Sequence, residues 1–220
     1  MIRVGSDTLA TVERELPSGS HGSPERGWLE HGGRLPTRGS NFVTYSYLGS
    51  LLGRTSVHSA VRAAVVDAYA SLHVAQPDLT FVYGETGWPR GGRFWPHRTH
   101  QNGLSVDFMV PVRDQRGRSV RLPTPPWRKF GYGIEFDSTG RWKGLRLDFE
   151  AMALHLDYLE QTARQHGLTI EVVIFASELQ PALFATTSGR TLRKRIRFST
   201  RPAWVRHDEH DHVNFRLAAA

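Results

Sequence analysis

The chain has 220 residues, of which 39% are hydrophobic and 22% charged, a composition typical of one globular domain with a substantial core. No stretch reaches the roughly 18 apolar residues of a transmembrane helix, so we expect no stable membrane insertion, and the lack of cysteine excludes disulfides and thiolate ligands. The net charge of +7 favours an anionic partner, such as nucleic acid, acidic lipid or a carboxylate-rich cell-wall polymer.

Residues 1–40 are rich in Gly, Ser, Pro and charged residues. We predict a poorly defined, extended N-terminal arm there, followed by one domain over residues 41–220. The first residues lack the apolar core of a signal peptide. Export without a leader, delivery into another cell and a truncated N-terminus are the three expectations that fit.

Helical spacing of apolar residues predicts a first helix, capped by Thr55 or Ser56 and ended by Pro77. The apolar positions are Val57, Val61, Ala64, Val65, Ala68 and Leu72. A short β-type run follows at 79–83, and then a loop with several Gly and Pro residues at 84–92.

Apolar residues alternate from Leu104 to Val110, which predicts a strand with Asp107 on the face opposite the core. We interpret residues 113–139, with their Pro and Gly residues, as a long loop. Its aromatic residues are candidates for contacts with a ligand. They are Trp127, Phe130 and Tyr132.

A second helix is predicted from its cap at Asp148 to Gly167, and a buried strand at 169–175. The last strand would carry Val213, Phe215 and Leu217 on one face and four polar side chains on the other. Those polar residues are His210, His212, Asn214 and Arg216. Helices and strands mix without βαβ alternation, so we predict an α+β fold with a central antiparallel sheet, flanking helices and long loops.

Histidines and carboxylates gather in two distant stretches of the chain. His100 and Asp107 lie in the first, and His210 and His212 in the second. Imidazole and carboxylate ligands without thiols suit zinc, and a catalytic zinc ion takes three protein ligands and leaves one position open. We therefore hypothesise that the stretches meet, with His100, Asp107 and His212 as ligands and His210 beside the open position.

Chance pairs and an adventitious nickel or zinc site are the alternatives, because the chain has 11 histidines. The other histidines outside these stretches are predicted not to bind a metal. They are His21, His31, His58, His73, His155 and His166. Of these, we expect His155 and His166 on the surface of the second helix.

Two sequence blocks resemble the signature of the penicillin-insensitive murein endopeptidases. One is residues 100–107, preceded by Gly91-Gly92-Arg93-Phe94 and His97, and the other is residues 201–213. That family belongs to a larger group with lysostaphin, the D-Ala-D-Ala carboxypeptidases and the hedgehog domains. A looser likeness extends from about residue 40 to the end. The arm before residue 40, the missing export signal and the absent cysteines depart from the family pattern.

The resemblance implies a hedgehog- or DD-peptidase-like fold and a zinc ion held by His100, Asp107 and His212. It makes His210 the catalytic histidine, as a base or as a stabiliser of the oxyanion. His97 and His207 match further family histidines, which either support the site or bind a second metal. Asp208, Glu209 and Asp211 are interpreted as solvated charges in preference to groups that orient the histidines.

The implied substrate is peptidoglycan in the periplasm or cell envelope, cut at the cross-link between D-alanine and a diamino acid. Three basic residues near the first block are weak candidates to bind stem-peptide carboxylates. They are Arg90, Arg93 and Arg98. A carboxypeptidase, an amidase and a non-catalytic zinc-bearing module that binds the cell wall stay as alternatives.

The residues from Arg190 to Arg201 give the best signal for nucleic-acid binding. Their alternation predicts a strand with Arg193, Arg195 and Arg197 on one face. No known DNA- or RNA-binding motif accompanies the run, so we expect no nucleic-acid partner.

Overall fold

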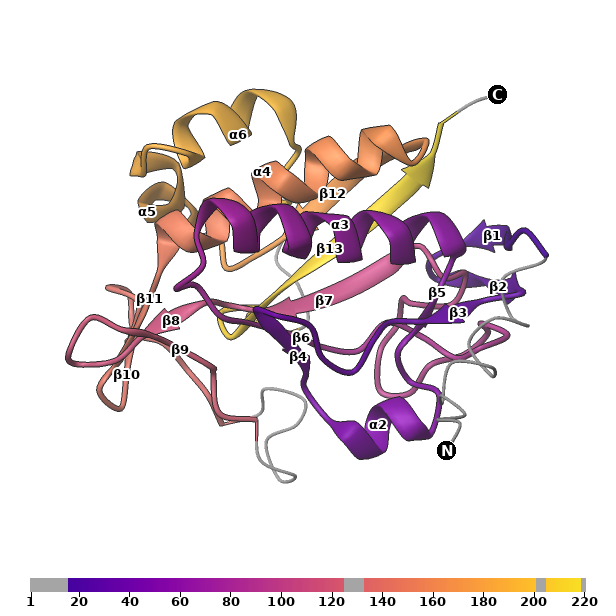
Figure 1. Cartoon of the computed structure of the whole chain (residues 1–220), viewed down its shortest axis with the longest axis horizontal. Helices are drawn as coiled ribbons and strands as arrows, with labels where there is room; N and C mark the ends of the chain where they lie inside the picture. Colours follow the sequence, from indigo (N-terminus) through magenta and orange to yellow (C-terminus); the bar gives the residue numbers. More distant parts are fainter. Residues whose placement is uncertain (1–15, 125–132, 201–204, 219–220) are drawn as a thin grey trace, which may run out of the picture.

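A five-stranded sheet runs through the centre of the computed structural model, which describes residues 16–124, 133–200 and 205–218 (Figure 1). Its strands, in spatial order, are β12 (Leu168–Ile174), β13 (His210–Leu217), β7 (Ser105–Met109), β6 (Phe81–Tyr83) and β4 (Phe42–Thr44). All neighbours are antiparallel except β4 and β6. The predicted α+β class is confirmed, with one parallel pair at the edge of the sheet.

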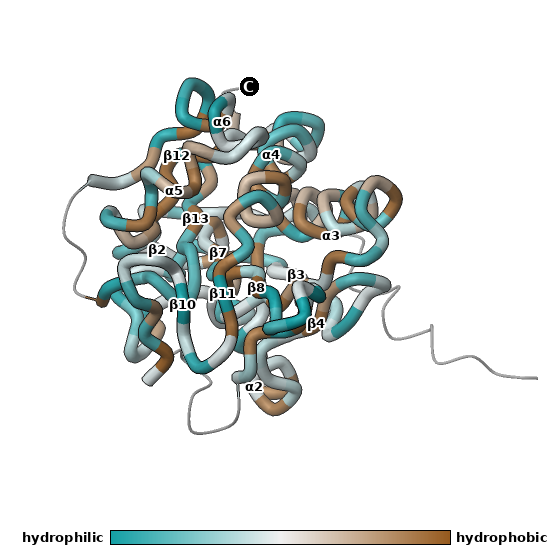
Figure 2. The backbone as a smooth tube through the Cα atoms, turned by 90° about the vertical axis from the view of Figure 1, so that its left-hand side faces the viewer, coloured by the Kyte–Doolittle hydropathy of each residue, from teal (hydrophilic) through white to brown (hydrophobic). Residues whose placement is uncertain are grey.

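Two long helices, α3 (Ser59–Ala75) and α4 (Phe149–Gln165), lie side by side across one face of this sheet (Figure 1). Hydrophobic and hydrophilic positions alternate along both helices (Figure 2), and their apolar residues join one core with the strands. Both helices match the prediction from spacing. Asp148 caps α4 as predicted, by accepting a hydrogen bond from the Ala151 amide at 3.2 Å.

The predicted cap of α3 is wrong by two or three residues. Ser56 and Val57 form strand β5, which pairs with β3 (Gly33–Arg34), so neither Thr55 nor Ser56 can cap the helix. Instead, the Nδ1 atom of His58 accepts a hydrogen bond from the Ala60 amide at 3.1 Å. Pairing with a distant strand therefore overrides the local capping preference.

Residues 16–40 contain more regular structure than their composition indicates. Strands β1 (Gly19–Ser23) and β2 (Arg26–Glu30) form a hairpin, and Leu29 is buried. A short helix, α2 (Tyr47–Leu51), follows β4. The domain boundary near residue 40 stays a prediction.

A second, four-stranded sheet has the order β10-β11-β8-β9. Its strands are β10 (Arg141–Trp142), β11 (Leu145–Leu147), β8 (Val112–Arg113) and β9 (Ser119–Val120). The segment 113–139 is therefore not entirely loop, because residues 113 and 119–120 pair in this sheet. The contact aromatics predicted there, Trp127, Phe130 and Tyr132, lie outside the described residues.

The strand predicted for the Arg-rich run is wrong. Helix α6 (Gly189–Arg195) occupies the first half of this run, after the short helix α5 (Gln180–Ala185). Leu192 and Ile196 are four residues apart, which suits one helix face as well as alternation suits a strand, and both are buried. Arg195 pairs with Asp157 and Glu160 of α4, so the arginines form no continuous ridge on a strand.

His155, which we expected at the surface of α4, is 3% exposed and lies in the core. Its ring stacks on Tyr69, at 5.1 Å between centroids, and meets Phe108 edge-on at 4.6 Å. Its Nε2 atom has no hydrogen-bond partner among the described residues. Burial lowers the pKa of His155 from 6.5 to about 3, so the ring is neutral in the folded protein.

His166, the other histidine expected at the surface of α4, follows the helix and is partly exposed. Its Nε2 atom lies 2.7 Å from Oδ2 of Asp67.

None of the described helices is both long and apolar enough to cross a membrane.

The burial of His155 predicts a dependence of stability on pH. Below pH 6.5 the unfolded chain protonates this ring and the folded chain does not, so stability falls as the pH decreases toward 3. We expect the free energy of unfolding of the wild type to fall more steeply than that of His155→Phe, by up to about 1.4 kcal/mol per pH unit. Urea unfolding between pH 7 and 4 measures this difference. Parallel curves for the two proteins would contradict it.

Candidate metal centre

The pairing of β7 with β13 brings the two histidine-containing stretches together. Asp107 lies directly opposite His212 in the antiparallel register, although the residues are 105 positions apart in the sequence. Directly opposed side chains in such a pair have Cβ atoms only about 5 Å apart. Accordingly, the Nδ1 atom of His212 is 2.8 Å from Oδ1 of Asp107. The meeting of the two stretches, expected from the sequence, is present in the structure.

His100 reaches the same carboxylate from the loop that follows β6. Its Nε2 atom lies 3.2 Å from Oδ1 of Asp107. Its backbone has φ 69°, an uncommon left-handed conformation outside glycine, which the surrounding structure must maintain. The ring is fully buried. The loop thus places this imidazole beside Asp107 at the cost of an unfavourable backbone conformation.

Hydrogen bonds at the outer nitrogens determine the tautomers of both rings. Nδ1 of His100 donates to the Thr86 carbonyl at 3.1 Å, so its Nε2 carries a lone pair and has no hydrogen-bond partner in the described part of the chain. Nε2 of His212 lies 2.8 Å from Oδ1 of Asn214, which also accepts from the Ser105 hydroxyl at 2.6 Å. With that oxygen as acceptor, Nε2 of His212 donates to Asn214, and its Nδ1 is the nitrogen that lies within hydrogen-bond distance of Asp107.

One nitrogen of each histidine therefore faces the same carboxylate oxygen. Their distances of 2.8 and 3.2 Å from Oδ1 of Asp107 are close to the spacing of about 3.3 Å between ligands of a tetrahedral zinc ion. Lone pairs and a carboxylate repel one another unless a cation lies between them. This donor set fits a metal ion of the kind that imidazole and carboxylate bind.

His97 lies on the other side of the same carboxylate. Its Nδ1 atom is 3.8 Å from Oδ2 of Asp107, and atoms of His97, His100 and Asp107 all fall within 4.8 Å of one another. These three residues form a group that could hold a metal ion. This group shares His100 and Asp107 with the predicted ligand set and has His97 in place of His212, so the structure brings beside the carboxylate a family histidine whose supporting or second-metal role stayed open.

Electrostatics keep Asp107 ionised despite its burial. Burial alone would raise its pKa, but the neighbouring His100 and His210 rings outweigh this and hold the pKa of Asp107 well below its usual range. Burial lowers the pKa of His100, against the opposing effect of Asp107. A carboxylate and a neutral imidazole are the protonation states that bind metals.

His210 lies on the same face of β13, two residues before His212. Its Nδ1 atom is 2.9 Å from Oε1 of Glu209. Burial would lower the pKa of His210, but the carboxylates of Glu209 and Asp107 outweigh it and raise the pKa to about 9. The ring centroids of His207 and His210 are 4.7 Å apart. Burial and the neighbouring His210 lower the pKa of His207 to about 4.

The acidic residues of the C-terminal block are not solvated, contrary to the interpretation from sequence. Asp208, Glu209 and Asp211 are all less than 9% exposed. Asp208 accepts hydrogen bonds from the Phe136 amide at 2.6 Å and from Arg206 at 2.9 Å. Asp211 alternates with His210 and His212 along β13 and lies opposite Phe108 on the core face, so a polar sequence pattern here does not mean exposure.

Sequence reasoning missed a buried carboxylate that contacts the group. Glu85 is 2% exposed, and its Oε2 atom lies 2.7 Å from Nε2 of His97. The same carboxylate pairs with Arg54 and accepts from the Tyr45 hydroxyl at 2.5 Å. The available signal was an acidic residue directly after a buried strand. Arg90, Arg93 and Arg98, the predicted substrate contacts, are exposed.

Comparison of the sequence with protein-family models and with curated proteins finds no match. The chemistry of the site therefore rests on its geometry.

Metal binding should depend on Asp107. After dialysis against Zn²⁺ and gel filtration, we expect about one metal ion per chain by mass spectrometry of the elements. Asp107→Ala should weaken binding by more than the roughly 100-fold upper limit for the loss of an outer-shell partner, because it removes a direct ligand. His21→Ala, which removes a partly exposed histidine from the β1–β2 hairpin, is the control. Equal metal content in Asp107→Ala and wild type would contradict the site.

Proposed function

We propose that the chain is a zinc-dependent peptidoglycan hydrolase, an endopeptidase that cleaves D-alanyl–diamino acid cross-links between stem peptides. The observation that carries the proposal is the convergence of two histidine nitrogens on Oδ1 of Asp107. A hedgehog- or DD-peptidase-like arrangement of the fold is part of the proposal. Its site of action is the cell envelope, in the periplasm where one exists.

In this proposal, His100, Asp107 and His212 hold the metal. A Zn²⁺ ion held there supplies polarisation of the scissile carbonyl and activation of water. The hydrogen bonds from His100 to Thr86 and from His212 to Asn214 orient the two rings, as outer-shell partners of metal-binding histidines generally do. Both rings are buried, which supports a rigid site.

His210 is proposed to transfer the proton. Glu209 accepts the hydrogen on Nδ1 of His210 and so leaves Nε2 as the atom that exchanges a proton with the reacting group. His210 lies opposite Met109, two residues along β7 from Asp107 and on the same face, and the Asp107 carboxylate contributes to raising its pKa. Either direction of proton transfer at Nε2 is compatible with this geometry, from the attacking water to His210 or from His210 to the developing oxyanion.

His97 is proposed to support the site and not to recruit a second metal. Its Nε2 hydrogen bonds to Glu85, and Glu85 already contacts Arg54 and Tyr45. These three partners leave this carboxylate no free position for another cation. Glu85 instead keeps the His97 imidazole fixed beside Asp107.

The choice of peptidoglycan rests on the resemblance of the two histidine blocks to murein endopeptidases and on the net charge of +7. Stem peptides carry free carboxylates, which a basic protein attracts.

The proposal predicts loss of cross-links from peptidoglycan. Purified, cross-linked sacculi digested with the zinc-loaded protein should lose muropeptide dimers and gain monomers in mass analysis. His212→Ala should abolish the change, because it removes a metal ligand, and His21→Ala should not. Loss of terminal residues alone would indicate a carboxypeptidase, and release of whole stems an amidase. An unchanged profile with zinc bound would contradict hydrolysis and favour a binding module.

Replacement of His210 separates catalysis from metal binding. We expect His210→Ala to keep the zinc content of the wild type and to lose roughly 100- to 10,000-fold in turnover, the usual contribution of a proton-transferring side chain. Muropeptide release and metal content are measured on the same sample. Full turnover with full zinc content would exclude the proposed role of His210.

A further inference from the structure

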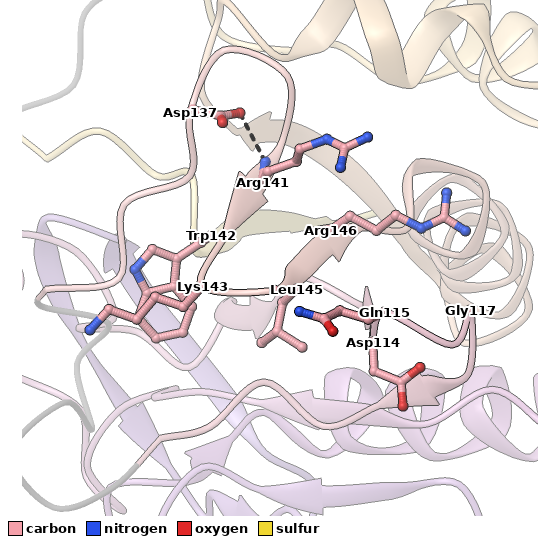
Figure 3. A pocket seen from close by; sticks show the side chains of 10 residues that line it. Asp114, Gln115, Gly117, Asp137, Arg141, Trp142, Lys143, Leu145 and Arg146 are labelled. Atoms are coloured by element: carbon pink, nitrogen blue, oxygen red, sulfur yellow. Dashed lines mark hydrogen bonds between the residues drawn. The ribbon is translucent and has the colours of Figure 1, made fainter.

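The outward face of the four-stranded sheet carries a row of arginines. Arg141 of β10 lies directly opposite Arg146 of β11, and Arg146 lies opposite Arg113 of β8. The other face of these strands carries Trp142 and Leu145, which pack against the core. In Figure 3, the side chains of Arg141 and Arg146 extend in the same direction, away from the indole of Trp142. Pairing of the strands thus forces three like charges side by side.

Among the described residues, Arg113 alone of the three has its guanidinium in an ion pair, although hydrogen bonding from Thr139 and the charge of Arg141 both lower the pKa of Asp137. Arg113 pairs with Asp148 at 2.6 Å and donates to the Gly117 carbonyl at 2.8 Å. The described residues supply no ion pair or hydrogen bond to the guanidinium groups of Arg141 and Arg146. Like charges directly opposite each other in a sheet are unfavourable. An anion placed between the two guanidinium groups would remove the repulsion.

The nearest acids are already engaged. The Oδ1 atom of Asp137 accepts hydrogen bonds from the Thr139 amide and hydroxyl and from the backbone amide of Arg141, at 2.7–3.0 Å. Asp114 pairs with Arg118 at 2.7 Å. These carboxylates stabilise their turns, and the face between them keeps an excess of positive charge.

A cavity of about 530 Å³ lies against β10, β11 and the turn between them, with Asp114 and Asp137 at its sides (Figure 3). Its lining includes three cations, Arg141, Lys143 and Arg146, and two acids, Asp114 and Asp137. Two carboxylates would repel a multiply charged phosphate more than a singly charged carboxylate. The ammonium of Lys143 lies over the Trp142 ring at 5.3 Å, so this indole face is not free to stack on a base. The lining therefore favours a carboxylate over nucleic acid.

We propose that this surface binds the free carboxylate of a stem peptide and so anchors the polymer during cleavage, an inference that rests on the proposed function. The β10–β11 hairpin is connected to the candidate metal centre through the segment that precedes β10. In this segment, Phe136 donates its amide hydrogen to Asp208 at 2.6 Å, and its carbonyl accepts from Arg206 at 2.6 Å. Asp208 lies two residues before His210, so the anchor and the centre share one rigid connection.

The test is binding of soluble muropeptides with free carboxylates, and of the same muropeptides after amidation of those groups, measured by calorimetry with the full chain. Arg141→Gln/Arg146→Gln should bind the native muropeptides roughly tenfold more weakly, because charge-assisted hydrogen bonds are lost. Amidated muropeptides should bind weakly to both proteins. Arg190→Gln/Lys194→Gln removes the same charge from exposed positions of α6 and should bind as the wild type does.

Equal affinity of the Arg141/Arg146 variant and the wild type would overturn the inference, as would an equal loss in the α6 control or full binding of amidated muropeptides. A DNA duplex that binds this face more tightly than the muropeptides would assign it to nucleic acid instead. Cross-link cleavage without Arg-dependent binding would leave the proposed function intact and remove only this inference. Binding that depends on Arg141 and Arg146 without cleavage of cross-links would support the carboxylate site and contradict the proposed hydrolysis.

Discussion

The candidate metal centre depends on the register between β7 and β13. Asp107 opposes His212, and the same register opposes His210 to Met109. Side chains alternate along a strand, so a slip by one residue would turn Asp107 toward the helices and the histidines away from it. The apolar partners on the other face prevent this slip. Val106 lies opposite Val213, and both are fully buried beneath α3 and α4. Packing of the core therefore sets the geometry of the site.

Burial makes this arrangement costly and chemically useful. Acids such as Glu85, Asp107 and Glu209 lie away from water beside the histidines. Buried charges persist only when they are paired, and here arginine, tyrosine and imidazole partners supply the pairing. At Asp107 this pairing comes from one nitrogen each of His100 and His212. A cation bound between these nitrogens and the carboxylate would complete the pairing of the buried charges. It would also explain why the folded chain keeps this buried arrangement.

Periodicity predicted the parts of the fold in which one pattern had one interpretation. The apolar spacing of α3 and α4 and the alternation in β7 and β13 each matched the structure. The Arg-rich run failed because Leu192 and Ile196 suit a helix as well as a strand. His155 failed because a polar residue type was read as exposed, although aromatic neighbours hold its neutral ring in the core. Both errors come from tertiary contacts that no local pattern encodes.

Site residues of unusual type and spacing could be predicted from the sequence, and site residues of common type could not. Histidine and aspartate at regular spacing indicated the centre. Glu85 and Arg54 gave no such signal, because lone charged residues in loops are ordinary. Their pairing appears only when β6 and the segment before β5 come together. The burial of Asp208 likewise depends on its contacts with Phe136 and Arg206, and that of Asp211 on the core face of β13.

The most direct test is an anomalous diffraction map of crystals of the zinc-loaded protein, recorded at the zinc absorption edge. The account predicts one strong peak bounded by Nε2 of His100, Asp107 and Nδ1 of His212, about 2.0–2.2 Å from each ligand atom. A zinc peak at other histidines, with these three side chains unchanged and joined by direct hydrogen bonds, would contradict it.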